Sequence, residues 1–454
     1  MKPFTSINPN LLSRRAMLKT SALGFGNLAL TGMLQAEAQG MPHFAARAKR
    51  IIFLFMHGGP SHVDTFDYKP KLFADDGKPL PFDKPRVQFA QTGNLGRPRW
   101  DFNPYGDCGH MISDLFPQVG SHADELCMIK SVHGTNAAHG GAMLKLNTGS
   151  DTLVRPSMGS WINYGLGSEN QNLPGFITID PSGGHGGAAN YASAFLPADH
   201  QGTRIGKEGS IPFLHPSVSA DRQEHQLAYL RRMNREHAAT FSANPQLEAR
   251  IKSYELAYRM QSEAPEAMDL SGETEATKRL YGIDNPKTQT FGERCLLARR
   301  LAERGVRYIQ VSHGYWDQHS KLESKHAELA YACDTPIAGL LTDLKQRGLL
   351  EDTLVWWGGE FGRTPTIQGK DGRDHNPHAF TMWFAGGGVK AGFSYGQTDD
   401  YGFYTVAEKM HVHDLHATIL HLMGLDHERL TYTFGGRPFR LTDVYGNVVR
   451  EVMA

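Results

Sequence analysis

The sequence predicts an α/β protein in which helices cover both faces of a largely parallel central sheet, forming a three-layer α/β/α sandwich. Two observations favour this class. Residues 51–56 form an unbroken apolar run ended by glycines, which is typical of a strand buried on both faces. Farther along the chain, other apolar runs alternate with segments of helical periodicity, as the crossover connections of a parallel sheet require.

The first forty residues are predicted to be an export signal and not part of the fold. Arg14 and Arg15 precede a mildly apolar stretch and then small residues around Ala36. The Ser-Arg-Arg-x-x-Leu-Lys pattern is typical of twin-arginine signals. We therefore expect the twin-arginine export machinery as a partner and a periplasmic or extracellular location. Residues 48–454 would form the remaining domain.

Composition narrows the classes of function. The 454 residues include 47 Lys and Arg and 47 Asp and Glu, so the formal net charge is zero and no nucleic-acid partner is expected. After the signal, no apolar run approaches the roughly twenty residues that span a bilayer, so no membrane span is expected in the mature chain. The four cysteines form no Cys-x-x-Cys pair, and a disulfide between Cys108 and Cys127 stays open.

The remaining elements follow in chain order. Residues 50–205 are rich in Gly, Pro and Asn, with short predicted strands at 125–132 and 173–179. A helical insertion is predicted at about 219–306, because charged segments with helical spacing lie at 221–241, 245–261 and 290–305. The chain is then predicted to form a strand at 306–314, a helix at about 323–348, a strand at 352–359, a long polar loop, a strand at 379–388 and a helix at 412–424.

Histidines and carboxylates gather at the ends of the predicted strands. Ligands bind beyond the carboxyl ends of parallel strands, so we expect these side chains to line one pocket. Their mixture of nitrogen and oxygen donors favours a divalent metal, with zinc preferred and manganese, iron or calcium as alternatives. The predicted metal ligands are His57, Asp64, Asp317, His319, Glu360, Asp374, His375 and His378.

Several long motifs resemble a known family. Residues 57–70, 155–176, 316–319, 358–365, 372–377 and 413–432 resemble the exported family catalogued as domain of unknown function 1501. The resemblance extends from about residue 50 to the C-terminus. Residues 328–365 and 412–424 are also similar to segments of sulfatases and related phosphoesterases. The resemblance implies an alkaline-phosphatase-like fold.

The superfamily pattern fits this chain with substitutions. His57 stands where an aspartate is usual, and Phe361 stands where a histidine ligand is usual. His139 takes the place of the nucleophile, which is Cys in sulfatases and Ser or Thr in phosphatases. His139 is therefore predicted to be a nucleophile, a metal ligand or an anion contact, with helix capping as the structural alternative. Arg363 is predicted to clamp an anionic oxygen, or else to form a salt bridge with Glu360 or Asp374.

Three functions are compatible with these residues. The leading one is an exported metal-dependent hydrolase of phosphate or sulfate esters, acting on a small anionic ester or on a sulfated or phosphorylated polymer. A water activated by the metal would explain the missing Ser, Thr or Cys nucleophile. The alternative is a non-catalytic metal- or anion-binding protein on the same fold. In a third, Ser61 would be the nucleophile of a serine hydrolase, although residues 59–63 lack the closing glycine of Gly-x-Ser-x-Gly.

Overall fold

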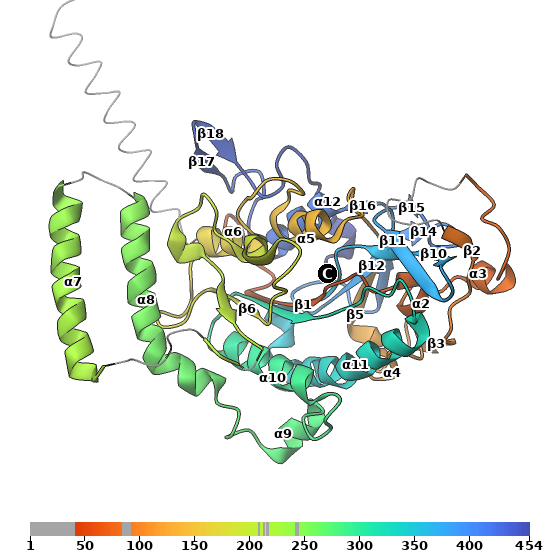
Figure 1. Ribbon diagram of the computed structural model, residues 1–454, viewed down its shortest axis with the longest axis horizontal. Helices are drawn as coiled ribbons and strands as arrows, with labels where there is room; N and C mark the ends of the chain where they lie inside the picture. The colour runs from red at the N-terminus through yellow and green to blue at the C-terminus, as the bar shows by residue number, and fades with distance from the viewer. Residues whose placement is uncertain (1–40, 84–91, 208, 212–213, 215–217, 241–244) are drawn as a thin grey trace, which may run out of the picture.

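A computed structural model describes residues 41–83, 92–207, 209–211, 214, 218–240 and 245–454 (Figure 1). The predicted export signal, with Arg14 and Arg15, lies outside the described residues. The described chain is an α/β sandwich built on one large sheet, which confirms the predicted fold class.

The central sheet has nine strands within the described residues. Eight of them form a continuous path, and the ninth, β16 (Met410–His411), pairs with β5. The path runs through β13 (Phe393–Tyr395), β5 (Leu126–His133), β12 (Phe380–Ala385), β9 (Thr353–Gly358), β1 (Arg50–Met56), β8 (Tyr308–His313), β6 (Phe176–Ile179) and β7 (Thr203–Ile205).

Strand β1 lies at the centre of this sheet, as its uninterrupted apolar run predicted. It pairs in parallel with β8 on one side and with β9 on the other. Only β12, among the paired strands of this sheet, runs antiparallel to its neighbours. The carboxyl ends of β1, β8 and β9 therefore open at the same edge, where a ligand site is expected.

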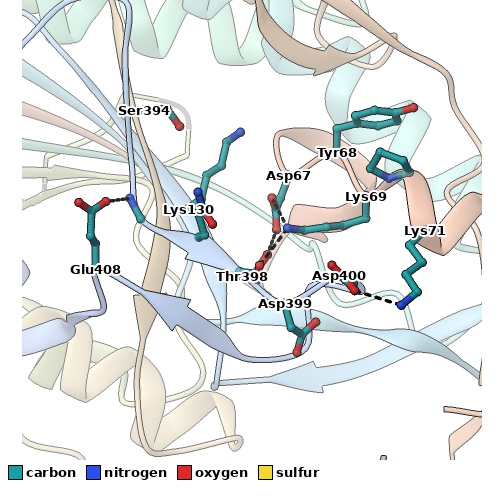
Figure 2. Close-up of a pocket in the computed structure, with 13 residues that line it drawn as sticks. Asp67, Tyr68, Lys69, Lys71, Lys130, Ser394, Thr398, Asp399, Asp400 and Glu408 are labelled. Atoms are coloured by element: carbon teal, nitrogen blue, oxygen red, sulfur yellow. Dashed lines mark hydrogen bonds and ion pairs between the residues drawn. The ribbon is translucent and has the colours of Figure 1, made fainter. Parts of the chain in front are cut away.

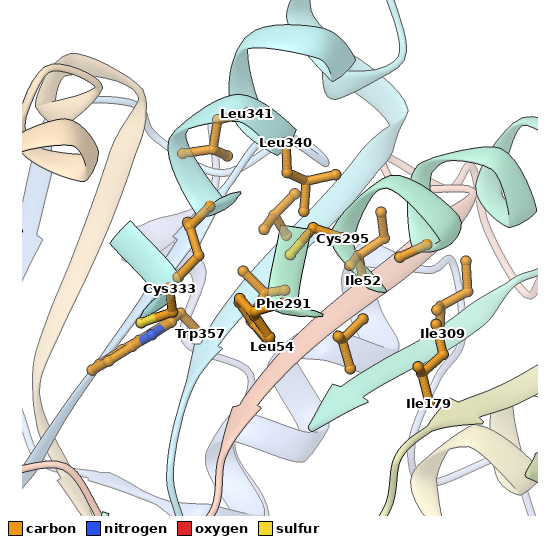
Figure 3. Close-up of a cluster of buried hydrophobic side chains, with 14 of the residues drawn as sticks. Ile52, Leu54, Ile179, Phe291, Cys295, Ile309, Cys333, Leu340, Leu341 and Trp357 are labelled. Atoms are coloured by element: carbon orange, nitrogen blue, oxygen red, sulfur yellow. The ribbon is translucent and has the colours of Figure 1, made fainter. Parts of the chain in front are cut away.

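Helices cover both faces of the sheet. On one face lie α5 (His139–Thr148), α6 (Met158–Leu166) and α12 (Val412–Leu422), and on the other lie α10 (Gln289–Glu303) and α11 (Leu322–Gln346) (Figure 1). Side chains of β1 alternate between the two apolar clusters that result, as successive residues of a strand must. Figure 3 shows one cluster, in which Ile52 and Leu54 lie near Cys295 of α10 and Leu340 of α11.

Smaller elements surround the sandwich. The additional helices are α2 (His62–Thr65), α3 (Pro70–Ala74), α4 (Pro117–Gly120), α7 (Ala220–Thr240), α8 (Pro245–Met268) and α9 (Glu275–Leu280). The 3-10 turns are η2 (Ala123–Glu125), η3 (Gly187–Tyr191), η4 (Ala198–His200), η5 (Leu350–Asp352) and η6 (Arg450–Val452). The strands outside the main sheet are β2 (Thr92–Leu95), β3 (Phe102–Tyr105), β4 (His110–Ser113), β10 (Gly362–Gln368), β11 (Gly372–Asn376), β14 (Gln397–Thr398), β15 (Thr405–Ala407), β17 (Tyr432–Phe434) and β18 (Arg437–Phe439).

The predicted long polar loop after β9 is wrong. The segment forms an antiparallel hairpin of β10 and β11, and β2 pairs with β10. Both strands are buried although most of their side chains are polar, because those side chains bond to one another and to nearby backbone groups. Without an apolar alternation, sequence periodicity could not indicate a strand here.

The region predicted as a helical insertion contains helices at one end of the molecule and also a helix that covers the sheet. Helices α7 and α8 stand at one end of the molecule (left in Figure 1), and α8 contacts η4 and α10. Helix α10 packs directly against β8 and α11 and belongs to the layer that covers the sheet. Within the described residues, no helix combines the length and the apolar character needed to cross a bilayer. All four cysteines are unpaired.

Candidate metal centre

Three imidazoles converge on the carboxylate of Asp317. This aspartate lies in the loop after β8, and His319 follows it by two residues, while His139 begins α5 and His375 lies in β11. The Nε2 atoms of His139, His319 and His375 lie 3.2, 2.9 and 3.1 Å from carboxylate oxygens of Asp317. The fold thus brings together four side chains that are far apart in the sequence.

Each imidazole is held on its other side by an acceptor outside this cluster. The Nδ1 atom of His139 lies 2.7 Å from Oε1 of Glu360, that of His319 lies 2.5 Å from Oε1 of Gln368, and that of His375 lies 2.6 Å from the carbonyl oxygen of Ala137. In the neutral imidazole, an acceptor at Nδ1 favours the tautomer in which Nδ1 carries the proton, so that Nε2 offers its lone pair to a cation. Metal-ligating histidines in proteins are commonly oriented in this way.

The donor set fits a divalent metal. Two groups of side chains have ligand atoms within 4.8 Å of one another: His139, Asp317 and His375, and His319, Asp374 and His375. The Nε2 atom of His139 is buried and has no hydrogen-bond partner, although it lies close to Asp317. A cation between Nε2 and the carboxylate would satisfy both groups, and the mixed nitrogen and oxygen donors suit zinc, manganese or iron.

Electrostatics keep Asp317 ionised. Burial opposes the charged carboxylate, but contacts with the three histidines and with Arg363 hold its pKa well below the ordinary range. Burial likewise opposes the protonated form of His139, but Asp317 and Glu360 outweigh it and raise the pKa of His139 to about 9. Without a cation this imidazole is therefore protonated at neutral pH, and a metal that binds Nε2 would have to displace the proton. Burial lowers the pKa of His375, which favours the neutral imidazole that binds metals. The ionised carboxylate of Asp317 is therefore the anionic centre of this cluster of histidines.

His139 does not cap helix α5. Ala138 is the N-cap residue, and the imidazole of His139 instead points to Glu360 and Asp317. The ring of Phe361 packs 4.4 Å from that of His375 and 4.9 Å from that of His139, measured between centroids. Phe361 therefore packs against two imidazoles from the position where a ligand was expected. For His139 the geometry excludes the capping role, and the roles of nucleophile, metal ligand and anion contact stay predictions.

Arg363 is fully buried and bonds extensively within the protein. Its Nε donates to the carbonyl oxygen of Gly59 at 2.9 Å, and its Nη2 donates to the carbonyl oxygens of Gly58 and Trp316. The same Nη2 lies 2.8 Å from Oδ1 of Asp317. The predicted salt bridge of Arg363 thus forms with Asp317, not with Glu360 or Asp374. Its guanidinium ties the turn after β1 to the carboxylate of the site.

Glu360 and His57 border the cluster without joining either group of converging ligands. The carboxylate of Glu360 accepts hydrogen bonds from the backbone N–H of Gly58 and from Nδ1 of His139. The imidazole of His57 is nearly buried against Gly314, edge-on to the ring of Tyr315, and burial lowers its pKa. Glu360 acts through His139, and His57 forms a wall of the site.

Ser61, Asp64 and His378 lie outside this network of contacts. The hydroxyl of Ser61 donates to Asp64, and Asp64 forms a fully buried ion pair with Arg373 at 2.6 Å. Ser61 itself is fully buried, unlike an accessible nucleophile. The ring of His378 packs against Tyr404, and its backbone N–H donates to Asn376. All three are accounted for by contacts that stabilise the fold.

Two groups that orient the histidines were not found from the sequence. Gln368 lies at the end of β10, inside the hairpin that was predicted to be a loop. Ala137 contributes only its backbone carbonyl group, which no side-chain pattern reveals. A correct strand prediction for residues 362–368 would have placed Gln368 beside the site, but their polarity gave no such signal.

Comparisons with known proteins give a family and a set of similar structures. A family model described as "Protein of unknown function (DUF1501)" matches residues 48–453. No curated protein matches the sequence.

Solved structures that are similar to this chain include three bacterial proteins. The lipoteichoic acid synthase LtaP from Listeria monocytogenes has 10% identity and a TM-score of 0.38, over 85% of this chain and 74% of that one. The PsFucS1 sulfatase from Pseudoalteromonas sp. has 14% identity and a TM-score of 0.35, over 91% and 72%. The alkaline phosphatase from the Antarctic bacterium TAB5 has 9% identity and a TM-score of 0.36, over 84% and 99%.

Proposed function

The chain belongs to the DUF1501 family, as its motifs predicted, and from its site we propose that it is an exported metal-dependent hydrolase of phosphate or sulfate esters. One observation carries the proposal. Three imidazoles present Nε2 to the carboxylate of Asp317, while each Nδ1 meets an acceptor outside the cluster. This arrangement of donors at the carboxyl edge of a parallel sheet is suited to a catalytic cation.

His139, Asp317, His319 and His375 would hold the metal, with Asp374 available on the side of His319. When bound, a divalent ion supplies Lewis-acid polarisation of an ester oxygen and lowers the pKa of a coordinated water. Glu360 keeps the imidazole of His139 in its orientation, and Arg363 does the same for the carboxylate of Asp317. The supporting contacts fix the ligands before substrate arrives, as preorganised catalysis requires.

Water is the proposed nucleophile. No Ser, Thr or Cys side chain contacts Asp317 among the described residues, and the nearby hydroxyl of Ser61 is buried and bonded to Asp64. The exposed ring of Tyr315 stands beside His57 at the edge of the site, where it can contact a substrate. We propose that the substrate is a small anionic ester or a sulfated or phosphorylated polymer.

A non-catalytic metal-binding protein is the second candidate, and Arg363 favours it. A phosphate or sulfate ester needs a cationic donor for its oxygens, but the guanidinium of Arg363 already donates to four backbone carbonyl groups and to Asp317. In this case the metal would stabilise the fold without turnover.

Metal analysis combined with an ester panel tests both candidates. We expect purified wild-type protein to retain at least about one equivalent of metal, and His319→Ala to lose it and to melt at a lower temperature. Wild-type protein should cleave a chromogenic phosphate monoester, phosphate diester or sulfate ester, and the variant should lose at least about 100-fold of that rate.

The outcomes separate the candidates. Unchanged metal content in His319→Ala would remove His319 from the ligand set. Bound metal without turnover on any ester would refute the hydrolase and support the binding protein. Wild-type protein that retains no metal after purification from zinc- and manganese-supplemented cultures would refute both.

A further inference from the structure

A second cavity lies apart from the metal ligands, between β5, the turn before α3 and the segment around β14 (Figure 2). Its volume is about 540 Å³, which lies within the range of small-molecule sites in proteins. The lining is mainly polar and includes Tyr68, Ser394 and Thr398. No residue predicted to form the metal site belongs to it.

The acidic side chains that line this cavity already have partners. The carboxylate of Asp67 lies 3.2 Å from Nζ of Lys69 and accepts a hydrogen bond from the hydroxyl of Thr398. Asp399 accepts hydrogen bonds from three backbone N–H groups of the turn that follows it. The carboxylate of Glu408 accepts one from the backbone N–H of Gly396. These carboxylates therefore bond to neighbouring groups of the cavity wall and stabilise it.

The three lysines that line the cavity differ in whether they have a carboxylate partner. Lys69 pairs with Asp67, and Lys71 pairs with Asp400 at 3.1 Å. Lys130 projects from the middle of β5 into the cavity (Figure 2), and within the described part of the chain its ammonium group has no carboxylate partner within ion-pair distance. Burial lowers the pKa of Lys130, and the carboxylate of Asp67, which opposes this shift, is already paired with Lys69.

We propose that this cavity is a binding site for a hydroxyl-bearing organic anion of the acidic-sugar type, whose single anionic group pairs with Lys130. A partly buried, unpaired ammonium group is costly and is stabilised when an anion supplies the missing charge. The hydroxyl and amide groups of Ser394, Thr398 and Gln397 offer hydrogen bonds to sugar hydroxyls, and the ring of Tyr68 offers a face for packing. The site is larger than an inorganic anion needs, which favours an organic ligand.

Calorimetric titration with glucuronate tests the site, with glucose as the neutral probe of the same shape. We expect saturable, millimolar binding of glucuronate to wild-type protein and none of glucose. Lys130→Met keeps an unbranched apolar side chain and removes its charge, so it should weaken binding at least tenfold. Lys325→Met is the matched control, because Lys325 is exposed, pairs with Glu328 and does not line the cavity, and it should change affinity less than twofold.

Further titrations identify which anionic group binds and where in the protein it binds. Glucose 6-sulfate and glucose 6-phosphate show whether a sulfate or phosphate replaces the carboxylate, and a Lys130-dependent gain over glucose with either one supports the site. Glucuronate binding should persist in His319→Ala, so failure of the proposed metal chemistry leaves this result unaffected. Binding lost in His319→Ala would place glucuronate at the metal centre and overturn the proposal.

A measurement on unaltered protein guards against misfolding of the variant. Lys130 should react more slowly with an acetylating reagent when glucuronate is present, as followed by peptide mass spectrometry, while glucose should have no effect. Equal acetylation rates with both sugars, or glucuronate affinity unchanged in Lys130→Met, would overturn the proposal.

Discussion

Replacing Asp64 by Asn should destabilise the protein without changing its metal content. Asp64 was predicted to be a metal ligand, but the structure pairs it with Arg373, and both side chains have no exposed surface. The guanidinium donates from Nε at 2.6 Å and from Nη2 at 3.3 Å, and the hydroxyl of Ser61 donates to the same carboxylate. The substitution leaves the charge of Arg373 buried and uncompensated.

The expected loss of stability in Asp64→Asn follows from the burial of this ion pair. Breaking a buried ion pair by neutralising one partner costs about 3–5 kcal/mol. An unfolding entropy of about 2.1 cal/mol/K per residue over roughly 400 residues gives about 0.8 kcal/mol/K, so the melting temperature should fall by about 4–6 °C. Ser61→Ala removes only one hydrogen-bond donor to this carboxylate and should cost about 1 kcal/mol, or about 1 °C.

Calorimetric melting and elemental analysis of the same samples check this prediction. Metal content should match wild type in Asp64→Asn at temperatures well below the transition, whereas Asp317→Asn should lose metal. If Asp64→Asn loses its metal and then melts like metal-free wild type, Asp64 is a ligand and our assignment of a structural role is wrong.

Three other predictions follow from particular residues. Gly58 has a φ of +108°, and a Cβ there would lie 2.5 Å from the backbone nitrogen of Trp316, so Gly58→Ala should lower the free energy of unfolding in urea by about 1–3 kcal/mol or more. Gly140→Ala in α5 is the control and should leave stability unchanged, because a Cβ there meets nothing within 4 Å. Equal stability of the two variants would contradict this prediction. Burial lowers the pKa of His416 to about 3, so this histidine contributes full stability above its unfolded pKa of 6.5 and loses it as the pH falls toward 3, by up to about 1.4 kcal/mol per pH unit. His416→Gln should flatten the fall in unfolding free energy between pH 6.5 and 4.5, and an unchanged slope would refute the assignment. Changing Arg14 and Arg15 to Lys should leave uncleaved precursor in the cytoplasm by immunoblotting of cell fractions, and normal export of that variant would refute the proposed route.

Much of the site could be predicted because of the geometry of parallel sheets. The apolar runs of β1, β8 and β9 identified strands whose carboxyl ends share one edge, and Asp317 and His319 follow one of those ends directly. His375 was also predicted, although from a segment assigned to a loop. It reaches the site because the β10–β11 hairpin folds back across the sheet edge.

Other residues could not be assigned from sequence position alone. Asp64 and His57 both follow β1 closely, yet helix α2 directs the carboxylate of Asp64 toward Arg373 and away from the cluster around Asp317. The direction of the Asp64 carboxylate depends on its ion pair with Arg373, which lies in the β10–β11 hairpin. Such a pairing between distant segments leaves no local pattern in the sequence.

The helix that carries His139 is bonded to α12, the last α-helix of the chain. His416 and His413 of α12 lie 2.7 and 2.9 Å, through Nε2, from the carbonyl oxygens of Leu146 and Gly149 at the end of α5. Helix α5, which carries His139 at its other end, is therefore held by a segment that is synthesised near the end of the chain. We therefore expect the side chains around Asp317 to reach their final arrangement only after the C-terminal region has folded.

This order of assembly connects the metal centre with the proposed export route. A twin-arginine signal directs proteins that are already folded, so a chain on that route has a complete ligand set before it crosses the membrane. Because metal binding is coupled to folding, we expect the metal to be loaded in the cytoplasm. Precursor of the variant with Lys at positions 14 and 15, purified from the cytoplasm, should then contain as much metal as exported protein. Metal-free precursor beside metal-loaded exported protein would show that loading follows export.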